Sequence, residues 1–260
     1  MRISTLLLLF AIYSFSAKSQ SWKVTGHYNL GLPRHDMEKN IQPDHGLQAG
    51  LMYQLPGKMK QLLVGIELGL GAYASKRIEQ TFQFDNNTAS VVPVNYNSNT
   101  FNANIQTRLN LLSDKNFIVP YISAKGGLYN FFSTIVVEDP DDPDGCHALE
   151  RKNIMNDKTL YWSAGAGFQV DPALFNKRKE KGNVLIDISV NTVRGGSLNY
   201  VNTKHLIDAQ TMNDPEGKPL QVHFVNASTQ AIHEHTVAQV FTSPLRLLEI
   251  RAGVTVLLGW

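Results

Sequence analysis

The last stretch of the chain, residues 242–260, alternates in polarity over most of its length and constrains the fold more than any other feature. It reads TSPLRLLEIRAGVTVLLGW. Every second residue from Leu248 to Trp260 is apolar, whereas the positions between them include Glu249, Arg251 and two glycines. Because successive side chains of a strand point to opposite faces, this pattern predicts a strand with one apolar face. A soluble sandwich would bury that face, whereas a membrane barrel would turn it towards lipid.

Seven earlier windows repeat the pattern. They cover residues 22–30, 47–55, 62–73, 101–111, 117–129, 160–170 and 184–191. The clearest is 101–111, where Phe101, Ile105 and Leu109 alternate with residues such as Asn104 and Arg108. Together with the last stretch, they predict eight strands.

The connections between these windows alternate between short and long. The short ones lie around 56–58, 113–116 and 171–182, and the long ones are 33–44, 74–100, 133–159 and 192–241. Outer-membrane barrels have short periplasmic turns and long outward loops, and an even strand number leaves both termini in the periplasm. We therefore predict an all-β fold, an eight-stranded antiparallel up-and-down transmembrane β-barrel with long extracellular loops and periplasmic N- and C-termini.

The composition of the less apolar strand face distinguishes a membrane barrel from a secreted β-sandwich or a lipocalin-like barrel. In a soluble protein it should be rich in Lys, Glu and Asp, but here it carries mainly Gly, Asn, Gln, Ser and Tyr. Its few ionisable residues are Lys23, His27, Glu67, Arg108, Lys125, Asp187, Glu249 and Arg251. A lumen of eight strands has room only for side chains, and buried charges must pair there. We expect these eight residues to form a polar network in the lumen.

All three tryptophans, Trp22, Trp162 and Trp260, lie on the apolar face near strand ends. Membrane barrels place aromatic residues at both lipid–water interfaces, so we expect these three to be interface aromatics, although so few residues could also fall there by coincidence.

The first residues have the features of a secretory signal peptide. Met1-Arg2 is positively charged, Leu6–Tyr13 is apolar, and Ala17-Lys18-Ser19 fits a cleavage site. We expect a signal peptide at 1–19 and a barrel domain at 20–260; a buried first strand or a membrane anchor is the alternative. No other run has about 18 consecutive apolar residues, so no transmembrane helix is expected. The single cysteine, Cys146, excludes an internal disulfide framework.

The closing strand, Glu249–Trp260 with its terminal aromatic, resembles that of the small eight-stranded outer-membrane β-barrel proteins. The resemblance covers all eight windows but not the long connections. It implies an outer-membrane location, surrounding outer-membrane lipid, and recognition of the C-terminal strand by the barrel-assembly machinery.

Candidate metal sites are weak. His233-Glu234-His235 offers two imidazoles without a third ligand, so a solvated loop is the preferred interpretation. The acidic tract at 138–145 has oxygen ligands suited to calcium, but Pro140 and Pro143 interrupt the spacing that a calcium loop needs. We expect no metal ion and no cofactor. The net charge of only +2 gives no indication of a nucleic-acid partner, and we expect none.

No catalytic residue is expected. Lipid-modifying outer-membrane enzymes resemble this chain in architecture, but they place a nucleophile and a histidine on the lipid-facing rim, and no outward position in the windows is Ser or His. The segment 192–241 is too long to be a passive connection, and its apolar residues suggest strand extension or docking, so we expect a protein partner to bind through this loop. The expected function is a scaffold whose surface loops bind a partner protein, or an accessory subunit of an envelope complex of the secretion, assembly or gliding type. The alternatives are a narrow channel or a lipid-modifying enzyme.

Overall fold

A computed structural model describes residues 22–85, 88–138, 148–175, 182–204, 217–225 and 232–258. The expected signal peptide at 1–19, Cys146 and Trp260 lie outside these ranges, as do residues 139–145 of the acidic tract.

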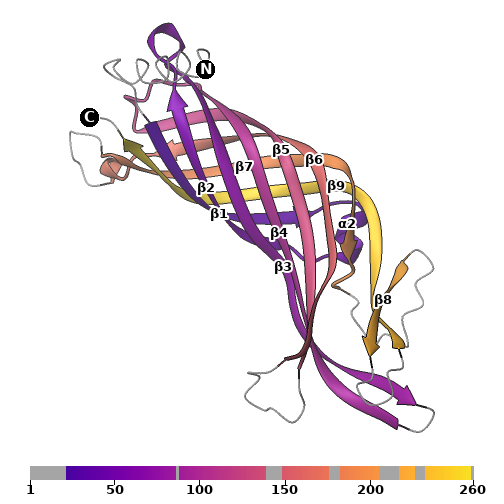
Figure 1. Cartoon of the computed structure of the whole chain (residues 1–260). Helices are drawn as coiled ribbons and strands as arrows, with labels where there is room; N and C mark the ends of the chain where they lie inside the picture. The colour runs from indigo at the N-terminus through magenta and orange to yellow at the C-terminus, as the bar shows by residue number, and fades with distance from the viewer. Residues whose placement is uncertain are drawn as a thin grey trace, which may run out of the picture.

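Eight long antiparallel strands close into a barrel (Figure 1). They are β1 (Trp22–Pro33), β2 (Asp44–Gln54), β3 (Leu62–Asp85), β4 (Thr88–Asn110), β5 (Ile118–Glu138), β6 (Ala148–Val170), β7 (Val184–Val201) and β9 (Ile232–Leu258). Each pairs with the next, and β9 pairs with β1 from Trp22↔Leu258 to Pro33↔Leu247. The predicted fold class is confirmed.

The strands meet their short connections at one end of the barrel, here called the turn end. Two single-turn 3₁₀ helices, Gly57–Met59 and Pro172–Leu174, lie there. The predicted strand boundaries agree with the structure at this end within a few residues.

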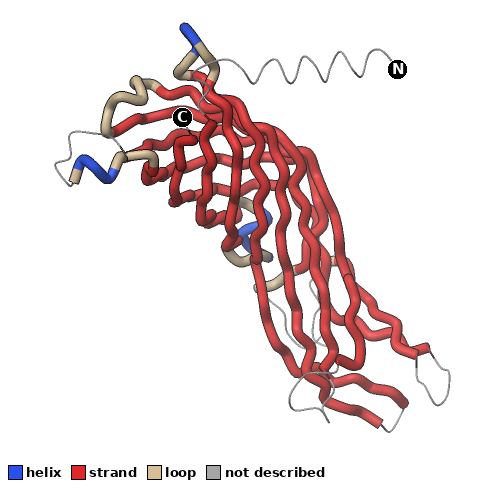
Figure 2. Tube along the Cα trace, turned by 60° about the vertical axis from the view of Figure 1, so that its left-hand side comes forward, coloured by secondary structure: helices blue, strands red, loops and turns tan. Residues whose placement is uncertain are grey.

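At the opposite end the long-loop prediction is wrong, because much of 74–100, 133–159 and 192–241 is strand. β3 to β6 have 21–24 residues and β9 has 27. About 9–11 residues suffice to cross a membrane. An additional strand, β8 (Lys218–Val225), pairs with β9. Figure 2 shows the strands continuing past the barrel. We call the continued parts, beyond Tyr73 on β3 and at the same level on its neighbours, the extension, and the remaining barrel the belt.

The extension consists of two sheets. Pairing between β6 and β7 ends at Tyr161↔Gly195, so β3–β4–β5–β6 separates there from β7–β9–β8. Apolar residues from both sheets form one buried cluster. Its buried members are Val92, Val94, Tyr96, Ile135, Val137, Val201 and Ala238. The extension is therefore a small β-sandwich that continues the barrel.

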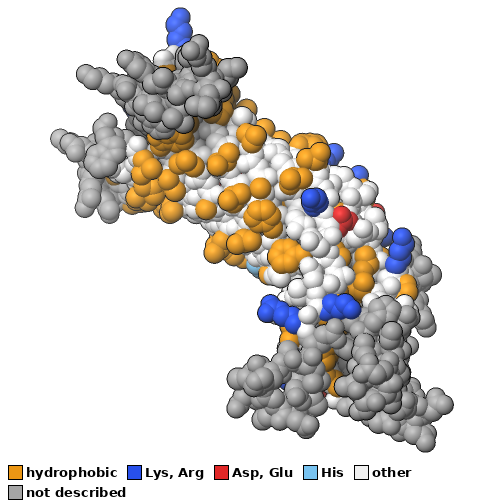
Figure 3. All heavy atoms as spheres, in the orientation of Figure 1, with side chains coloured by type: hydrophobic (Ala, Val, Ile, Leu, Met, Phe, Trp, Pro, Cys, Tyr) orange, Lys and Arg blue, Asp and Glu red, His pale blue; other side chains and the backbone are white. Residues whose placement is uncertain are grey.

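The polarity of the two strand faces reverses between belt and extension. In the belt part of β4, Phe101 and Ile105 are exposed outside the barrel and Asn104 is buried inside. Further along the same strand Tyr96 is buried inside, and the outward positions are the partly exposed Asn95, Asn97 and Asn99. Figure 3 shows hydrophobic side chains spread over the barrel and Lys and Arg side chains gathered towards the extension.

The connection 33–44, predicted as a loop, contains the short helix α2 (Asp36–Asn40). Met37 and Ile41 are buried in an apolar cluster with Leu245 and Leu247 of β9. The backbone N–H of Thr203 donates a hydrogen bond to the Asn40 carbonyl at 2.9 Å. α2 therefore folds inwards at the junction of belt and extension. Among the described residues, no helix has the length and hydropathy to span a bilayer.

Candidate functional site

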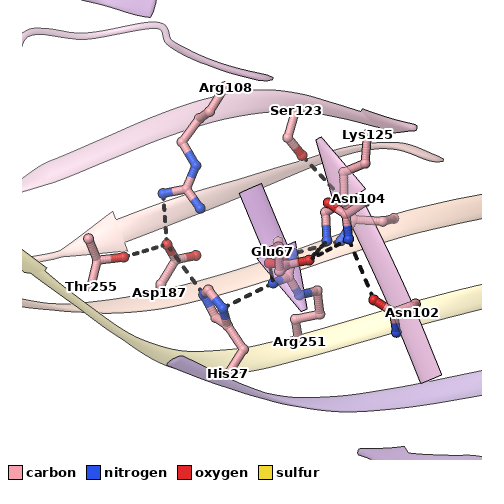
Figure 4. A network of polar contacts seen from close by, with 12 residues as sticks. His27, Glu67, Asn102, Asn104, Arg108, Ser123, Lys125, Asp187, Arg251 and Thr255 are labelled. Atoms are coloured by element: carbon pink, nitrogen blue, oxygen red, sulfur yellow. Dashed lines mark hydrogen bonds and ion pairs between the residues drawn. The ribbon is translucent and has the colours of Figure 1, made fainter. Parts of the chain in front are cut away.

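The lumen of the belt holds all eight residues expected there. Each is at most 6% exposed, and together they come from six strands. Figure 4 shows six of them: His27, Glu67, Arg108, Lys125, Asp187 and Arg251. β1 contributes Lys23 and His27, and β9 contributes Glu249 and Arg251. The other four, Glu67, Arg108, Lys125 and Asp187, come from β3, β4, β5 and β7.

Glu67 is the centre of one cluster. The Lys125 Nζ donates to Glu67 Oε1 at 2.6 Å, and the Arg251 guanidinium donates to Oε2. The Asn104 side-chain amide adds a long contact to Oε1 at 3.4 Å. One carboxylate therefore faces two cations, so the ionised form of Glu67 is compensated even though it is fully buried.

Asp187 is the centre of a second cluster. It accepts hydrogen bonds from Arg108 Nη1 at 2.9 Å, Tyr121 OH at 2.5 Å, Gln169 Nε2 at 2.9 Å and Thr255 Oγ1 at 3.0 Å. The Arg108 guanidinium also lies 4.0 Å from the centroid of the Tyr121 ring. Three of these donors bind Oδ2 and Tyr121 binds Oδ1, so the ionised form of this fully buried carboxylate is compensated.

His27 lies between the two clusters. Its Nδ1 is 3.0 Å from Arg251 Nη2, and its Nε2 is 3.7 Å from Asp187 Oδ2. Because a guanidinium has only donors, Nδ1 must accept, which places a ring proton on Nε2, towards Asp187. His27 therefore lies between Arg251, which binds the Glu67 carboxylate of β3, and the Asp187 carboxylate of β7.

Two further carboxylates, which the sequence analysis did not include, occupy the two ends of the lumen. Asp114, in the turn between β4 and β5, accepts from Lys23 Nζ at 2.9 Å, Gln54 Nε2 at 2.7 Å and Asn110 Nδ2 at 2.7 Å. Burial raises the pKa of Asp114, but the attraction of Lys23 and these hydrogen bonds outweigh it, so the pKa lies below its usual value.

Asp44 lies at the opposite end of the lumen. It accepts from Thr100 Oγ1 at 3.0 Å and from Tyr129 OH at 3.1 Å. Gly31 pairs with Asp44 on one side and with Glu249 on the other, which places Glu249 at the same level. The alternation of the second window, extended back by three residues, would have placed Asp44 on the polar face.

Above Asp44 the interior becomes aromatic. The rings of Tyr73, Phe131, Tyr129 and Tyr161 follow one another with centroid separations of 5.2 to 5.5 Å. The lumen is thus filled by side chains at its turn end, at its centre and at its junction with the extension.

The tryptophans lie as follows. Trp22 begins β1 at the turn end, with its ring centroid 5.1 Å from that of Tyr53. Trp162 is on the outward face of β6, 51% exposed, and the Arg194 guanidinium lies 5.9 Å from the centroid of its ring. A guanidinium beside a tryptophan on an outward face suits the boundary between hydrocarbon and water.

The candidate metal ligands do not form a site in the part of the chain that the structure describes. No group of three or more His, Cys, Asp and Glu there is placed to hold a metal ion. His233-Glu234-His235 is in β9, where Glu234 pairs with His223 of β8, so the loop interpretation is wrong. Glu138 ends β5, and the rest of the acidic tract lies outside the described residues.

One outward histidine lies just before the second window. His45 is exposed on β2, and its Nδ1 is 2.5 Å from the Tyr28 hydroxyl. Within the described ranges, no serine or carboxylate side chain is hydrogen-bonded to His45. The pair therefore does not form the nucleophile–histidine–acid arrangement of a hydrolase.

No family model and no curated protein matches the chain. Solved structures of similar fold include neisserial surface protein A, with a TM-score of 0.38 and 10% identity over 91% of this chain and 96% of that chain. A major outer membrane protein from Thermus thermophilus gives 0.43 and 11%, over 92% and 99%. Ail, the attachment invasion locus protein of Yersinia pestis, gives 0.37 and 9%, over 92% and 99%.

The chain is a small eight-stranded β-barrel of the outer-membrane type. At these identities and TM-scores the matches carry nothing about its activity. Its membrane architecture follows from the closed sheet, the apolar outer face of the belt and the polar lumen. Hydrogen bonds and ion pairs to the central carboxylates connect side chains from β1, β3, β4, β5, β6, β7 and β9 across the lumen.

Proposed function

We propose that this barrel is an outer-membrane scaffold whose extension binds a partner protein outside the cell, as an accessory subunit of an envelope complex. The turn end, with both termini, would then face the periplasm, as in other barrels with short turns at one end. The membrane-embedded belt anchors the extension, and the extension provides the binding surface.

The observation that carries this proposal is the folded extension itself. Strands of 21–27 residues exceed what the membrane requires, and their added length packs two sheets around a buried core. A passive connection between strands needs only a few residues. An ordered sandwich beyond the membrane supplies a rigid surface on which binding residues can be held.

The sheet edges of the extension favour a protein as the partner. In the described residues, β3 beyond Ala74 pairs with β4 alone, and β6 before Tyr161 pairs with β5 alone. β8 likewise pairs with β9 alone. Each of these edges presents backbone groups that can pair with an added strand.

The alternative of a narrow channel has less support, because Glu67, Lys125 and Arg251 occupy the centre of the lumen. Planar-bilayer recordings test it: we expect no stepwise current. Reproducible single-channel steps would contradict a filled lumen. The alternative of a lipid-modifying enzyme is tested by mass analysis of outer-membrane lipids with and without the protein, where we expect no change.

The proposal is tested by shortening the extension while keeping the belt. One variant replaces residues 79–93, the tip of the β3–β4 hairpin, with Asn-Gly between the paired Ile78 and Val94. A second replaces residues 205–231, which include β8, with a Gly-Ser linker. Affinity purification from native membranes in mild detergent should recover a partner with the full-length chain and lose it with at least one variant. Recovery of the same partner with both variants would overturn the proposal. Native-gel mobility before and after heating verifies that each belt is folded.

A further inference from the structure

The lipid-facing surface of the belt has a groove on β1 to β4. Its volume is about 630 Å³. Its apolar walls come from Leu47, Leu68, Leu70 and Phe101, and the small side chains of Ala49 and Ala72 leave the space between them. All six point outwards, so the groove opens to the surroundings of the barrel and not to the lumen.

The register gives the groove a direction. Ala49 pairs with Leu68, Leu47 with Leu70, and His45 with Ala72. The groove therefore runs along β2 from Ala49 to His45, four residues or about 13 Å. Its apolar part begins in the belt, and its end at His45 lies level with the start of the extension.

A polar pair closes that end. The Tyr28 hydroxyl and His45 Nδ1 are hydrogen-bonded at 2.5 Å, and both residues line the groove. If the hydroxyl donates, the ring proton is on Nε2. Among the described residues, Nε2 of the exposed His45 has no hydrogen-bond partner, so it can donate to a group at the end of the groove.

We propose that this groove binds one acyl chain of a phosphate-bearing lipid of the surrounding membrane, whose phosphate oxygen accepts a hydrogen bond from His45. The groove is continuous with the apolar surface of the belt, where Leu47 and Leu70 are 69% and 64% exposed, so its contents must be hydrocarbon. A chain in the groove is distinguished from bulk lipid by close packing and by the polar contact, because lipid tails are as apolar as the leucines themselves. The proposal depends on the membrane placement of the belt and not on partner binding by the extension.

The chain offers a matched pair of substitutions for the test. Ala72→Phe fills the outer part of the groove, and Ala49→Phe fills its inner part. The control is Ala166→Phe, which adds the same ring at an exposed outward alanine. Ala166 is on β6, which does not line the groove. Unheated gel mobility establishes that each variant is folded, and Ala49→Phe replaces Ala72→Phe if the latter does not fold.

The measurement is native mass spectrometry of the full barrel in detergent, titrated with dimyristoyl phosphatidylglycerol. We expect one lipid bound in preference to the rest, weakened about tenfold by Ala72→Phe or Ala49→Phe and unchanged by Ala166→Phe. Equal binding by the groove variants and the Ala166→Phe control would overturn the proposal.

The polar contact is tested with dimyristoyl glycerol, which has the same chains without the phosphate. The wild-type barrel should prefer the phospholipid several-fold, and His45→Phe should abolish that preference while leaving diacylglycerol binding in place. A preference that survives in His45→Phe would refute the role of His45.

Discussion

The belt and the extension are built from the same strands but turn opposite faces to their surroundings. In the belt the outward side chains are apolar and the inward ones polar; in the extension buried apolar residues face inwards and the outward ones include Asn95 and Asn97. β4 crosses from one to the other without a break in its pairing to β5. The backbone hydrogen bonds between strands therefore continue unchanged from one surrounding medium to the other. Only the polarity of the outward side chains changes with the medium.

The two regions are also stabilised differently. The extension gains from removing Ile135, Tyr96 and their neighbours from water. The outward leucines of the belt gain little from one another in lipid, so the belt depends on its backbone pairing and on the compensated charges of the lumen.

The largest expected effect comes from removing the charge at the centre of the lumen. Glu67→Gln leaves Lys125 and Arg251 without their carboxylate, and we expect a loss of about 3–5 kcal/mol in the free energy of unfolding. Urea titration of the barrel in lipid vesicles measures it. The control is Glu79→Gln on the outward face of the extension. Equal losses in the two variants would contradict the role of the lumen network.

A pair of isoleucines tests the reversal directly. Ile135 is 1% exposed inside the extension, and Ile105 is 68% exposed outside the belt. Ile135→Ala should destabilise the extension by about 2–4 kcal/mol because it leaves a cavity. Ile105→Ala leaves none and should cost well under 1 kcal/mol. Hydrogen exchange of the amides in each region gives both values, and a larger effect at Ile105 would contradict the comparison.

Arginine substitutions on the outward face of β4 test where the lipid-facing surface of the belt ends. Ile105→Arg should destabilise the barrel by about 2–4 kcal/mol if Ile105 lies near the middle of the bilayer. Asn97→Arg, eight residues along β4, should have almost no effect, since that position faces water. Unfolding in vesicles compares the two variants, and similar costs would place both positions in the same medium.

The smallest expected effect is the loss of stability at low pH when Asp114, at the turn end, becomes protonated. The pKa of Asp114 is lowered in the folded barrel, so its pairing with Lys23 stabilises the barrel above the ordinary carboxyl pKa of about 4 and is lost as the pH falls through the folded value. Asp114 is 34% exposed, so the effect should be below about 1 kcal/mol. Asp114→Asn should flatten the dependence of the urea midpoint on pH below about pH 4, and Asp36→Asn, on the exposed surface, should not. An unchanged slope in Asp114→Asn would contradict the assignment.

The belt could be predicted from the sequence because every part of it follows one local rule. Period-two alternation defines the eight strands, and the same phase places Glu67, Asp187 and Arg251 inside. Asp44 and His45 were missed because they precede the second window. Asp114 was missed because it lies in a turn and reaches the lumen through Lys23, 91 residues earlier.

The extension could not be predicted in the same way. Between Asn95 and Thr100 both faces of β4 are largely polar, so the segment resembles a loop. Its strands are stabilised by a second sheet that comes from β7, β8 and β9, about a hundred residues or more along the chain, and such packing overrides local propensity. α2 has five residues, too few for a helical period. The signal peptide, Trp260 and most of the acidic tract remain predictions.

The reversal of faces is tested most directly by spin labels along the outward side of β4. In a barrel with Cys146 replaced by serine, single cysteines at Asn95, Asn97, Phe101, Ile105 and Leu109 are labelled and reconstituted in vesicles. Labels at Phe101, Ile105 and Leu109 should collide with oxygen, which dissolves in lipid, and labels at Asn95 and Asn97 with a water-soluble nickel chelate. Free access of the nickel chelate to the label at Ile105 would contradict the account.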